Sequence, residues 1–239
     1  MKRSTRRNID ALDLAVIRGR LQQTAEEMDL VHVKAAFSPI VSEMADRANS
    51  IIDPKRIEVV MQGRTGHPMF VSTMQASARS MVEGIGAPLE DGDVLVMNVP
   101  FLGGTHLHDI KLLRPFFHAG EMVLYLANTG HFMDIGSASA AGFDPGATDM
   151  FQEGLQIPPT YLFRRGELRA DVLRLLLQNT RLPEAQEGDF RAQINALEVG
   201  VRRLEALVAE RGVGRLRDAI IELAERSEAQ MRDKLRLVP

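Results

Sequence analysis

The sequence predicts an α+β protein with a mixed, largely antiparallel central sheet, flanking helices and a C-terminal helical hairpin. Three apolar runs in the middle of the chain, at residues 94–99, 110–117 and 122–127, are typical of strands. Apolar residues recur at helical spacing near the start of the chain and over its last third. We therefore expect an α+β region over residues 1–185 and a helical hairpin over residues 186–239 that packs on it.

The elements before the middle region alternate between helix and strand. The first segment predicts a helix that ends before Pro39, because the residue ahead of a proline is disfavoured in the helical conformation. Residues 57–61 form a short β-branched run, and we expect a strand there. Residues 72–84 predict a helix that is ended by the glycines after it. The apolar residues of the first helix are Ile9, Leu12, Val16, Leu21 and Met28.

The strands of the middle region follow one another closely, which favours an antiparallel meander. Residues 118–121 have the His-Ala-Gly-Glu composition of a tight turn between the second and third strands. Residues 136–149 are dominated by Gly, Ala, Ser, Asp and Pro and predict a loop. A further turn is expected around residues 165–166.

The last third of the chain predicts two helices. Apolar residues spaced alternately three and four apart form a seam along one helix face. Residues 212–214 interrupt this helix, and a second helix follows. We expect the pair to serve packing or subunit contact, and a direct role in the functional site is the alternative. The seam consists of Ile194, Leu197, Val201, Leu204 and Val208.

Composition excludes several classes of protein. The 29 basic and 32 acidic side chains give a net charge of −3, which argues against a nucleic-acid coat protein. The absence of cysteine excludes disulfides, thiolate metal sites and cysteine nucleophiles. No apolar run approaches the roughly 18 residues that span a bilayer. Asp10 and Asp13 interrupt the segment where a signal peptide would be apolar. We expect a cytoplasmic protein with no nucleic-acid or membrane partner.

Histidines and aspartates recur at two strand ends. The spacing His-x-x-Asp occurs at His106/Asp109 and again at His131/Asp134. In an antiparallel meander the two segments lie at the same end of the sheet, so these four side chains are expected to be neighbours. Imidazole and carboxylate ligands suit Mn, Zn or Fe(II) rather than a soft metal. The alternative is that these histidines are surface residues or ordinary hydrogen-bonding groups.

The other histidines are weaker candidates. His108 alternates with the candidate ligands and is expected either to support them or to be exposed. His118 lies in the predicted turn, where we expect it to be solvated, and His67 precedes a proline and is expected to be structural. No P-loop, complete dinucleotide fingerprint or Gly-x-Ser-x-Gly elbow is present. Any nucleotide is therefore expected to bind on another subunit.

The region around these residues resembles the hydantoinase B/5-oxoprolinase family, which includes the B subunit of ATP-dependent N-methylhydantoinase and a related acetone carboxylase subunit. The resemblance covers most of the chain, and its motifs occur in the family's order. They are Ala36-Phe37-Ser38-Pro39, the stretch 98–110 (Asn-Val-Pro-Phe-Leu-Gly-Gly-Thr-His-Leu-His-Asp-Ile), Gly130-His131, Asp134-Ile135-Gly136, Gln152-Glu153-Gly154-Leu155, Ile157-Pro158-Pro159, Asn179-x-Arg181 and Gly188-Asp189.

The resemblance implies a metal-bearing subunit that works with a larger, hydantoinase A-like subunit that binds ATP. In the acetone carboxylase branch, a His-x-x-Asp and a later histidine hold a divalent metal, usually manganese, and the matching positions are His106, Asp109 and His131. Zinc or iron is the alternative. Asp134 is then a fourth ligand or an acceptor that orients an imidazole. The implied assembly is a hetero-oligomer.

The resemblance also implies a reaction. The partner phosphorylates the carbonyl oxygen of a cyclic amide or imide with ATP, and water at the metal then attacks the activated carbon. Glu153 or Asp134 is expected to accept the proton. Two alternatives are a subunit of an ATP-dependent ketone carboxylase and a non-catalytic fragment whose helices bind partner subunits.

The chain departs from the family pattern in three motifs and in length. Val99, Ser137 and Phe70 stand where the family has an aspartate, a glycine and a histidine, which predicts a substrate other than hydantoin or oxoproline. Family members run to more than twice this length. The chain is therefore expected to be a truncated product, a split subunit or a partial sequence, and these three alternatives stay open.

Overall fold

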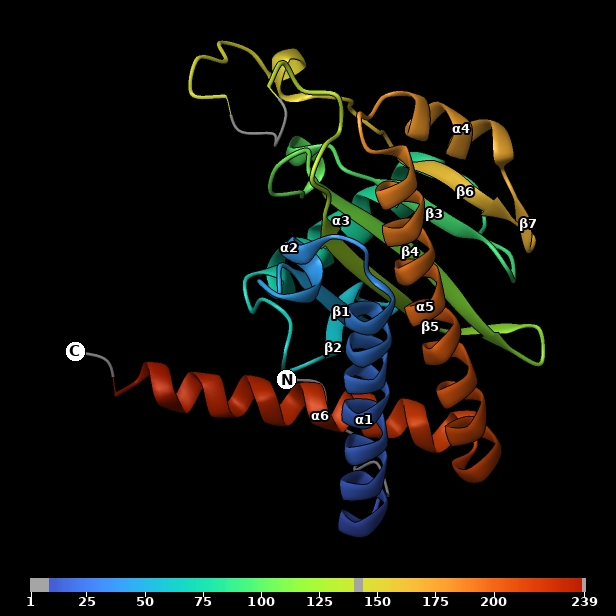
Figure 1. Ribbon diagram of the computed structural model, residues 1–239. Helices are drawn as coiled ribbons and strands as arrows, with labels where there is room; N and C mark the ends of the chain where they lie inside the picture. Colours follow the sequence, from blue (N-terminus) through green and yellow to red (C-terminus); the bar gives the residue numbers. More distant parts are fainter. Residues whose placement is uncertain (1–8, 140–143, 238–239) are drawn as a thin grey trace.

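The computed structural model describes residues 9–139 and 144–237 and confirms the α+β class (Figure 1). A single seven-stranded sheet has the order β2-β1-β5-β4-β3-β6-β7, and each of its strand pairs is antiparallel. The strands are β1 (Arg47–Asp53), β2 (Glu58–Gln62), β3 (Val94–Met97), β4 (Asp109–His118), β5 (Glu121–His131), β6 (Thr160–Arg164) and β7 (Glu167–Leu168). The helices are α1 (Ala11–Ala35), α2 (Pro39–Ser42), α3 (Phe70–Ile85), α4 (Ala170–Gln178), α5 (Pro183–Arg211) and α6 (Val213–Leu235), with short 3-10 turns η1 (Pro100–Leu102) and η2 (Met150–Glu153).

The predicted meander is confirmed. Strands β3, β4 and β5 are neighbours, and the register of β4 and β5 places Asp109 opposite His131. The expected strand at residues 57–61 is found as β2, and the expected helix at residues 72–84 as α3. The turn between β4 and β5 is also present, as is the turn at residues 165–166 between β6 and β7. The loop at residues 136–149 has no helix or strand over its described part.

The sheet has two buried faces because helices cover both sides of its centre. Alternate residues of a strand point to opposite faces. On one face, Ile51, Leu112 and Leu126 belong to a large apolar core shared with α1 and α5. On the other, Leu113 and Ala127 pack with a smaller cluster that includes the α3 residues Met74, Ala78 and Met81. The functional residues described below project from the face that α3 covers.

Helices α1 and α5 lie side by side over the larger core (Figure 1). The side chain of Asp10 caps α1 by accepting a hydrogen bond from the Asp13 N–H at 2.7 Å. Gly200 permits the close approach of α5, since a Cβ there would lie 2.8 Å from the sulfur of Met28 and 2.9 Å from a methyl of Leu126. Both helices are thereby fixed against the centre of the sheet.

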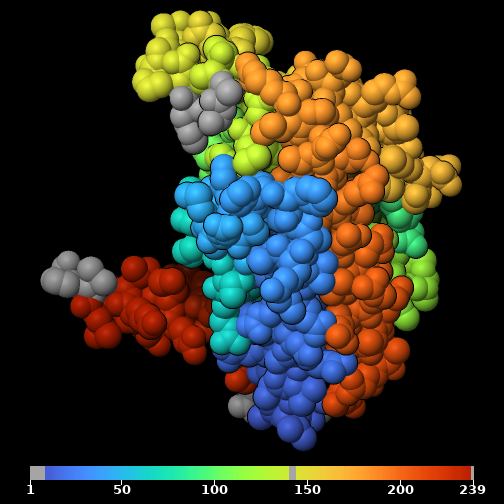
Figure 2. Space-filling view, viewed as in Figure 1, coloured from blue at the N-terminus to red at the C-terminus, as the bar shows by residue number. Residues whose placement is uncertain are grey.

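The two predicted C-terminal helices are present, but their arrangement differs from the expected hairpin. Helix α6 does not return along α5; it crosses behind α1 and passes β2 (Figure 1). Its start is held where the buried Asp13 of α1 pairs with Arg211, at 2.9 Å, and with Arg215. Beyond Ile220 the helix has no fully buried side chain among the described residues, and it projects from the body of the molecule (Figure 2). The division into two regions at residue 185 stays a prediction.

Helices α2 and α4 and strands β1, β6 and β7 were not expected from the sequence. Helix α4 lies over β6, and β1 lies between β2 and β5. Strand β1 could not be recognised from the sequence because it contains the polar residues Arg47, Asn49 and Ser50, although all three side chains are buried. Within residues 9–139 and 144–237, no helix is long and apolar enough to cross a membrane.

Candidate metal centre

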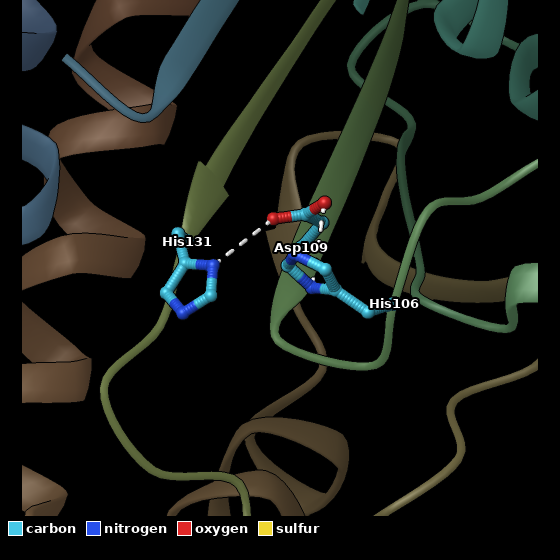
Figure 3. Close-up of side chains that lie close together, drawn as sticks. All are labelled: His106, Asp109 and His131. Carbon is cyan, nitrogen blue, oxygen red and sulfur yellow. Dashed lines mark ion pairs between the residues drawn. The ribbon is translucent and has the colours of Figure 1, made fainter. Parts of the chain in front are cut away.

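Three of the predicted ligands meet at one end of the sheet (Figure 3). Asp109 is the first residue of β4, His131 is the last residue of β5, and His106 comes from the loop before β4. One ligand atom from each of the three side chains lies within 4.8 Å of the other two. The meander brings Asp109 and His131 together as paired residues, and the chain reversal before β4 adds His106.

The three side chains are arranged around the Asp109 carboxylate. Its Oδ1 lies 3.4 Å from Nδ1 of His131, and its Oδ2 lies 3.5 Å from Nδ1 of His106. The Thr105 hydroxyl also donates a hydrogen bond to Oδ2. Asp109 is 1% exposed and His131 is 5% exposed, whereas about a third of the His106 side chain, 34%, remains exposed. The centre is therefore reached by solvent on the side of His106.

Hydrogen bonds from the Asn98 side chain fix the loop that carries His106. The Asn98 side-chain amide donates to the carbonyls of Leu107, at 2.7 Å, and Leu155, at 2.9 Å, and its oxygen accepts from the Ile157 N–H at 2.6 Å. Earlier in the loop, Gly103 has a φ of +89°, which favours glycine. Asn98 thus fixes the position of the ligand loop relative to residues 155–157.

The sequence reasoning missed Asp46. Its Oδ2 lies 3.4 Å from Nδ1 of His131, and its backbone carbonyl accepts a hydrogen bond from the His131 N–H at 3.1 Å. It directly precedes β1, whose pairing places Arg47 opposite Gly130. Because β1 could not be recognised from its polar sequence, nothing in the sequence signalled that Asp46 reaches the centre.

The charges of the centre suit a cation. Burial lowers the pKa of His106, although Asp109 opposes the change. Burial works to raise the pKa of Asp109, but His131, His106 and Lys111 outweigh it and the pKa lies below its usual value. At neutral pH the His106 imidazole is therefore neutral and Asp109 is ionised. Neutral imidazoles and carboxylate oxygens form the mixed donor set that Mn, Zn and Fe(II) accept.

His108 and Lys111 lie beside the ligands. The His108 ring stacks on that of His131, with centroids 5.3 Å apart, and burial lowers the pKa of His108 to about 4. His108 is therefore buried against a ligand and not exposed. Lys111 follows Asp109 by two residues on the same face of β4 and is fully buried. Burial lowers the pKa of Lys111 to about 8, against the opposing effect of Asp109.

The two predicted proton acceptors lie outside the ligand group. The Asp134 carboxylate accepts hydrogen bonds from the backbone N–H of Arg181 at 2.5 Å and from the Arg181 guanidinium at 2.7 Å. Gln186 donates to the Asp134 carbonyl, so this residue ties the loop after β5 to the start of α5. Glu153 is the last residue of η2 and is half-buried. His118 is exposed, as expected, but it is the last residue of β4, directly before the β4–β5 turn.

Comparison with known proteins gives three findings. A family model described as Hydantoinase B/oxoprolinase matches residues 10–239. The chain is 36% identical over 231 residues to caprolactamase subunit beta from Pseudomonas jessenii, an alignment that covers 97% of this chain and 39% of that protein. The crystal structure of ATP-dependent caprolactamase from the same organism superposes with a TM-score of 0.89 at 34% identity, over 98% of this chain and 40% of that one.

The nucleotide-free structure of acetone carboxylase is also similar. Its TM-score is 0.84 over 90% of this chain and 28% of that chain, and at 21% identity this likeness concerns the fold alone. The chain therefore spans about two fifths of the length of its caprolactamase relative and a smaller share of the carboxylase chain.

Proposed function

The chain belongs to the hydantoinase B/oxoprolinase family, and from that membership we propose that it is the metal-bearing part of an ATP-dependent hydrolase for cyclic amides. The observation that carries the proposal is the convergence of His106, Asp109 and His131 on one point. The relative named caprolactamase subunit beta supports a lactam as the substrate class. The same name supports a hetero-oligomer, in which a hydantoinase A-like subunit is the proposed partner that binds ATP.

We propose that His106, Asp109 and His131 hold one divalent cation, with manganese first and zinc or iron as alternatives. Two imidazoles and a carboxylate fit such an ion, and Asp46 supplies a second carboxylate beside His131. When bound, the cation polarises a carbonyl oxygen and lowers the pKa of water at the centre. The open side at His106 is where a substrate carbonyl would enter.

The residues of this chain have separate tasks in the proposed reaction. An amide carbonyl is a poor electrophile, so the ATP-binding partner first transfers the terminal phosphoryl group of ATP to its oxygen and releases ADP. Water then adds to the activated carbon, the ring carbon–nitrogen bond breaks, and a second water molecule releases phosphate from the acyl phosphate. Glu153 and Asp134 stay our predicted proton acceptors. Asp46 is a further candidate, because its carboxylate is about a third exposed (32%) and adjacent to His131. Since the Asp134 carboxylate is held by Arg181, we propose that it also stabilises the loop that follows His131.

Two alternatives have less support. A ketone carboxylase subunit would share this fold, but the likeness to acetone carboxylase carries no chemistry at 21% identity. A non-catalytic interaction fragment would not need a buried histidine, His131, beside a buried carboxylate, Asp109, at a sheet end. The cytoplasmic location stays a prediction.

The test is ATP-dependent ring opening of caprolactam, hydantoin and 5-oxoproline by the chain with its ATP-binding partner. His131→Ala is expected to abolish turnover, whereas His118→Ala, at the exposed last residue of β4, is expected to leave it unchanged. Ring opening without bicarbonate supports the hydrolase, and a requirement for bicarbonate with a ketone supports the carboxylase. Full turnover by His131→Ala would contradict the proposed site.

A further inference from the structure

Directly behind the metal ligands lies a second pair of polar residues on the same face of the sheet. Strands β4 and β5 pair Asp109 with His131, and two residues further along they pair Lys111 with Thr129. Because alternate strand residues share a face, both pairs project toward the side covered by α3. Asp109 and His131 are the ligand pair; Lys111 and Thr129 form what we call the inner pair.

Both members of the inner pair are buried without a hydrogen-bond partner. Lys111 and Thr129 are each 0% exposed, and neither Nζ of Lys111 nor Oγ1 of Thr129 has a partner within residues 9–139 and 144–237. A buried ammonium group that donates no hydrogen bond is strongly unfavourable. The Phe70 ring, 5.9 Å from Nζ, compensates only weakly. The inner pair therefore offers several N–H and O–H donors that lack an acceptor.

The surroundings of Lys111 favour a negatively charged acceptor. Phe70 is the first residue of α3, and Met69 at the N-cap makes no side-chain hydrogen bond to the helix end. The ring that lies over the ammonium group therefore comes from the residue at the positive end of the α3 dipole. Asp109 and Asp46 together balance a divalent cation, so the charge of Lys111 makes the occupied centre positive overall. An uncharged substrate would leave that charge unbalanced.

We propose that Lys111 and Thr129 form a subsite for an anionic oxygen, and specifically for a phosphoryl oxygen of the substrate held at the metal centre. The assignment rests on the proposed function in one respect, since it takes the phosphorylated amide as the species that reaches the centre. Lys111 donates to the phosphoryl group by its ammonium and Thr129 by its hydroxyl. The alternative is that Lys111 is a buried charge with only a structural role.

The test is calorimetric titration of the purified, manganese-loaded chain with inorganic phosphate, after free metal has been removed. Lys111→Met is expected to weaken phosphate binding by at least about tenfold, because a charge-assisted donor is lost. Thr129→Val, which keeps the shape of the side chain, is expected to weaken it by about threefold. Lys55→Met removes an exposed lysine of the β1–β2 turn and is expected to leave binding unchanged. Acetate is expected to bind more weakly than phosphate.

Several outcomes overturn the subsite. They are no phosphate binding by the wild-type chain, equal binding by Lys111→Met, and tighter binding of acetate, which would assign a carboxylate instead. Lys111→Met should unfold at a higher denaturant concentration because an unpaired buried charge is removed. If Lys111→Met does not fold, the test rests on Thr129→Val, and unchanged phosphate binding by that variant would overturn the subsite.

The metal content of the same sample tests the proposed function separately. A sample that holds manganese but no phosphate overturns the subsite alone. A sample that takes up no manganese overturns the metal centre, and the same comparison of variants is then made on the metal-free chain.

Discussion

His32 makes the stability of this protein depend on pH in a way that can be calculated. Its ring lies in α1 at 0% exposure, with Nδ1 3.3 Å from the Asn49 side-chain nitrogen, which also donates to Asp29 at 2.8 Å. A Cβ at Gly130 would lie 3.3 Å from Nε2, so the ring packs against the residue before His131. Burial, with the nearby charge of Arg47, lowers the pKa of His32 to about 3. The native protein therefore keeps this imidazole neutral.

The expected loss of stability follows from the two pKa values, 6.5 for the ordinary histidine and about 3 for His32 in the native state. Above the unfolded-state pKa, His32 is neutral in both the native and the unfolded state, and the protein has its full stability. As the pH falls below the unfolded-state pKa of 6.5, His32 binds a proton in the unfolded chain but not in the native protein. The free energy of unfolding then falls by about 1.4 kcal/mol per pH unit, and by about 2.7 kcal/mol at pH 4.5.

Urea unfolding of the metal-free chain at pH 7.5 and 4.5 measures this loss. In His32→Gln the residue cannot titrate, so wild-type stability should fall about 2.7 kcal/mol further than that of the variant between the two pH values. Every other ionisable side chain is common to both proteins, so its contribution cancels in the difference. His118→Gln, at the exposed last residue of β4, should behave as the wild type does. Equal losses for wild type and His32→Gln would refute the reasoning.

Substitutions at four positions test the packing of the fold by urea unfolding. Asn98→Ala removes three buried hydrogen bonds and should lower the free energy of unfolding by about 3 kcal/mol, and no measurable loss would contradict this. Asp189→Ala leaves two backbone N–H groups after α1 without their acceptor and should cost about 2 kcal/mol, most of which Asp189→Asn should restore. Gly120→Ala, at a φ of +78° in open space, should cost about 1 kcal/mol. Gly103→Ala, whose Cβ would lie 2.5 Å from that of Ala76, should cost about 2 kcal/mol more, and equal losses at the two glycines would refute the contact.

The sequence predicted those parts of the fold that have regular apolar patterns. The meander of β3, β4 and β5 was predicted because its strands are apolar and its connections short. Strand β1 was not, because Asn49 and Arg47 are polar. Their burial depends on tertiary contacts, such as that between Asn49 and Asp29 and that between Arg47 and Thr65. The direction of α6 also depends on a distant contact, the pairing of Asp13 with Arg211.

The same limit applies to the functional site. Local spacing and the meander predicted that His106, Asp109, His131 and Asp134 are neighbours. The family resemblance then singled out the first three as the predicted ligands. Asp46 was missed because it reaches His131 only through the pairing of β1 with β5. The partner of Asp134 could not be foreseen, since Arg181 lies 47 positions away with two strands and a helix between them.

The most direct test of the metal centre is the metal content of the purified chain. After incubation with manganese, zinc or iron(II) and removal of free ion, we expect elemental analysis to find about one divalent ion per wild-type chain. His106→Ala and His131→Ala should lose the ion while remaining folded, and His118→Ala should retain it. A wild-type chain that is folded but holds no ion, or variants that hold as much as the wild type, would contradict the account.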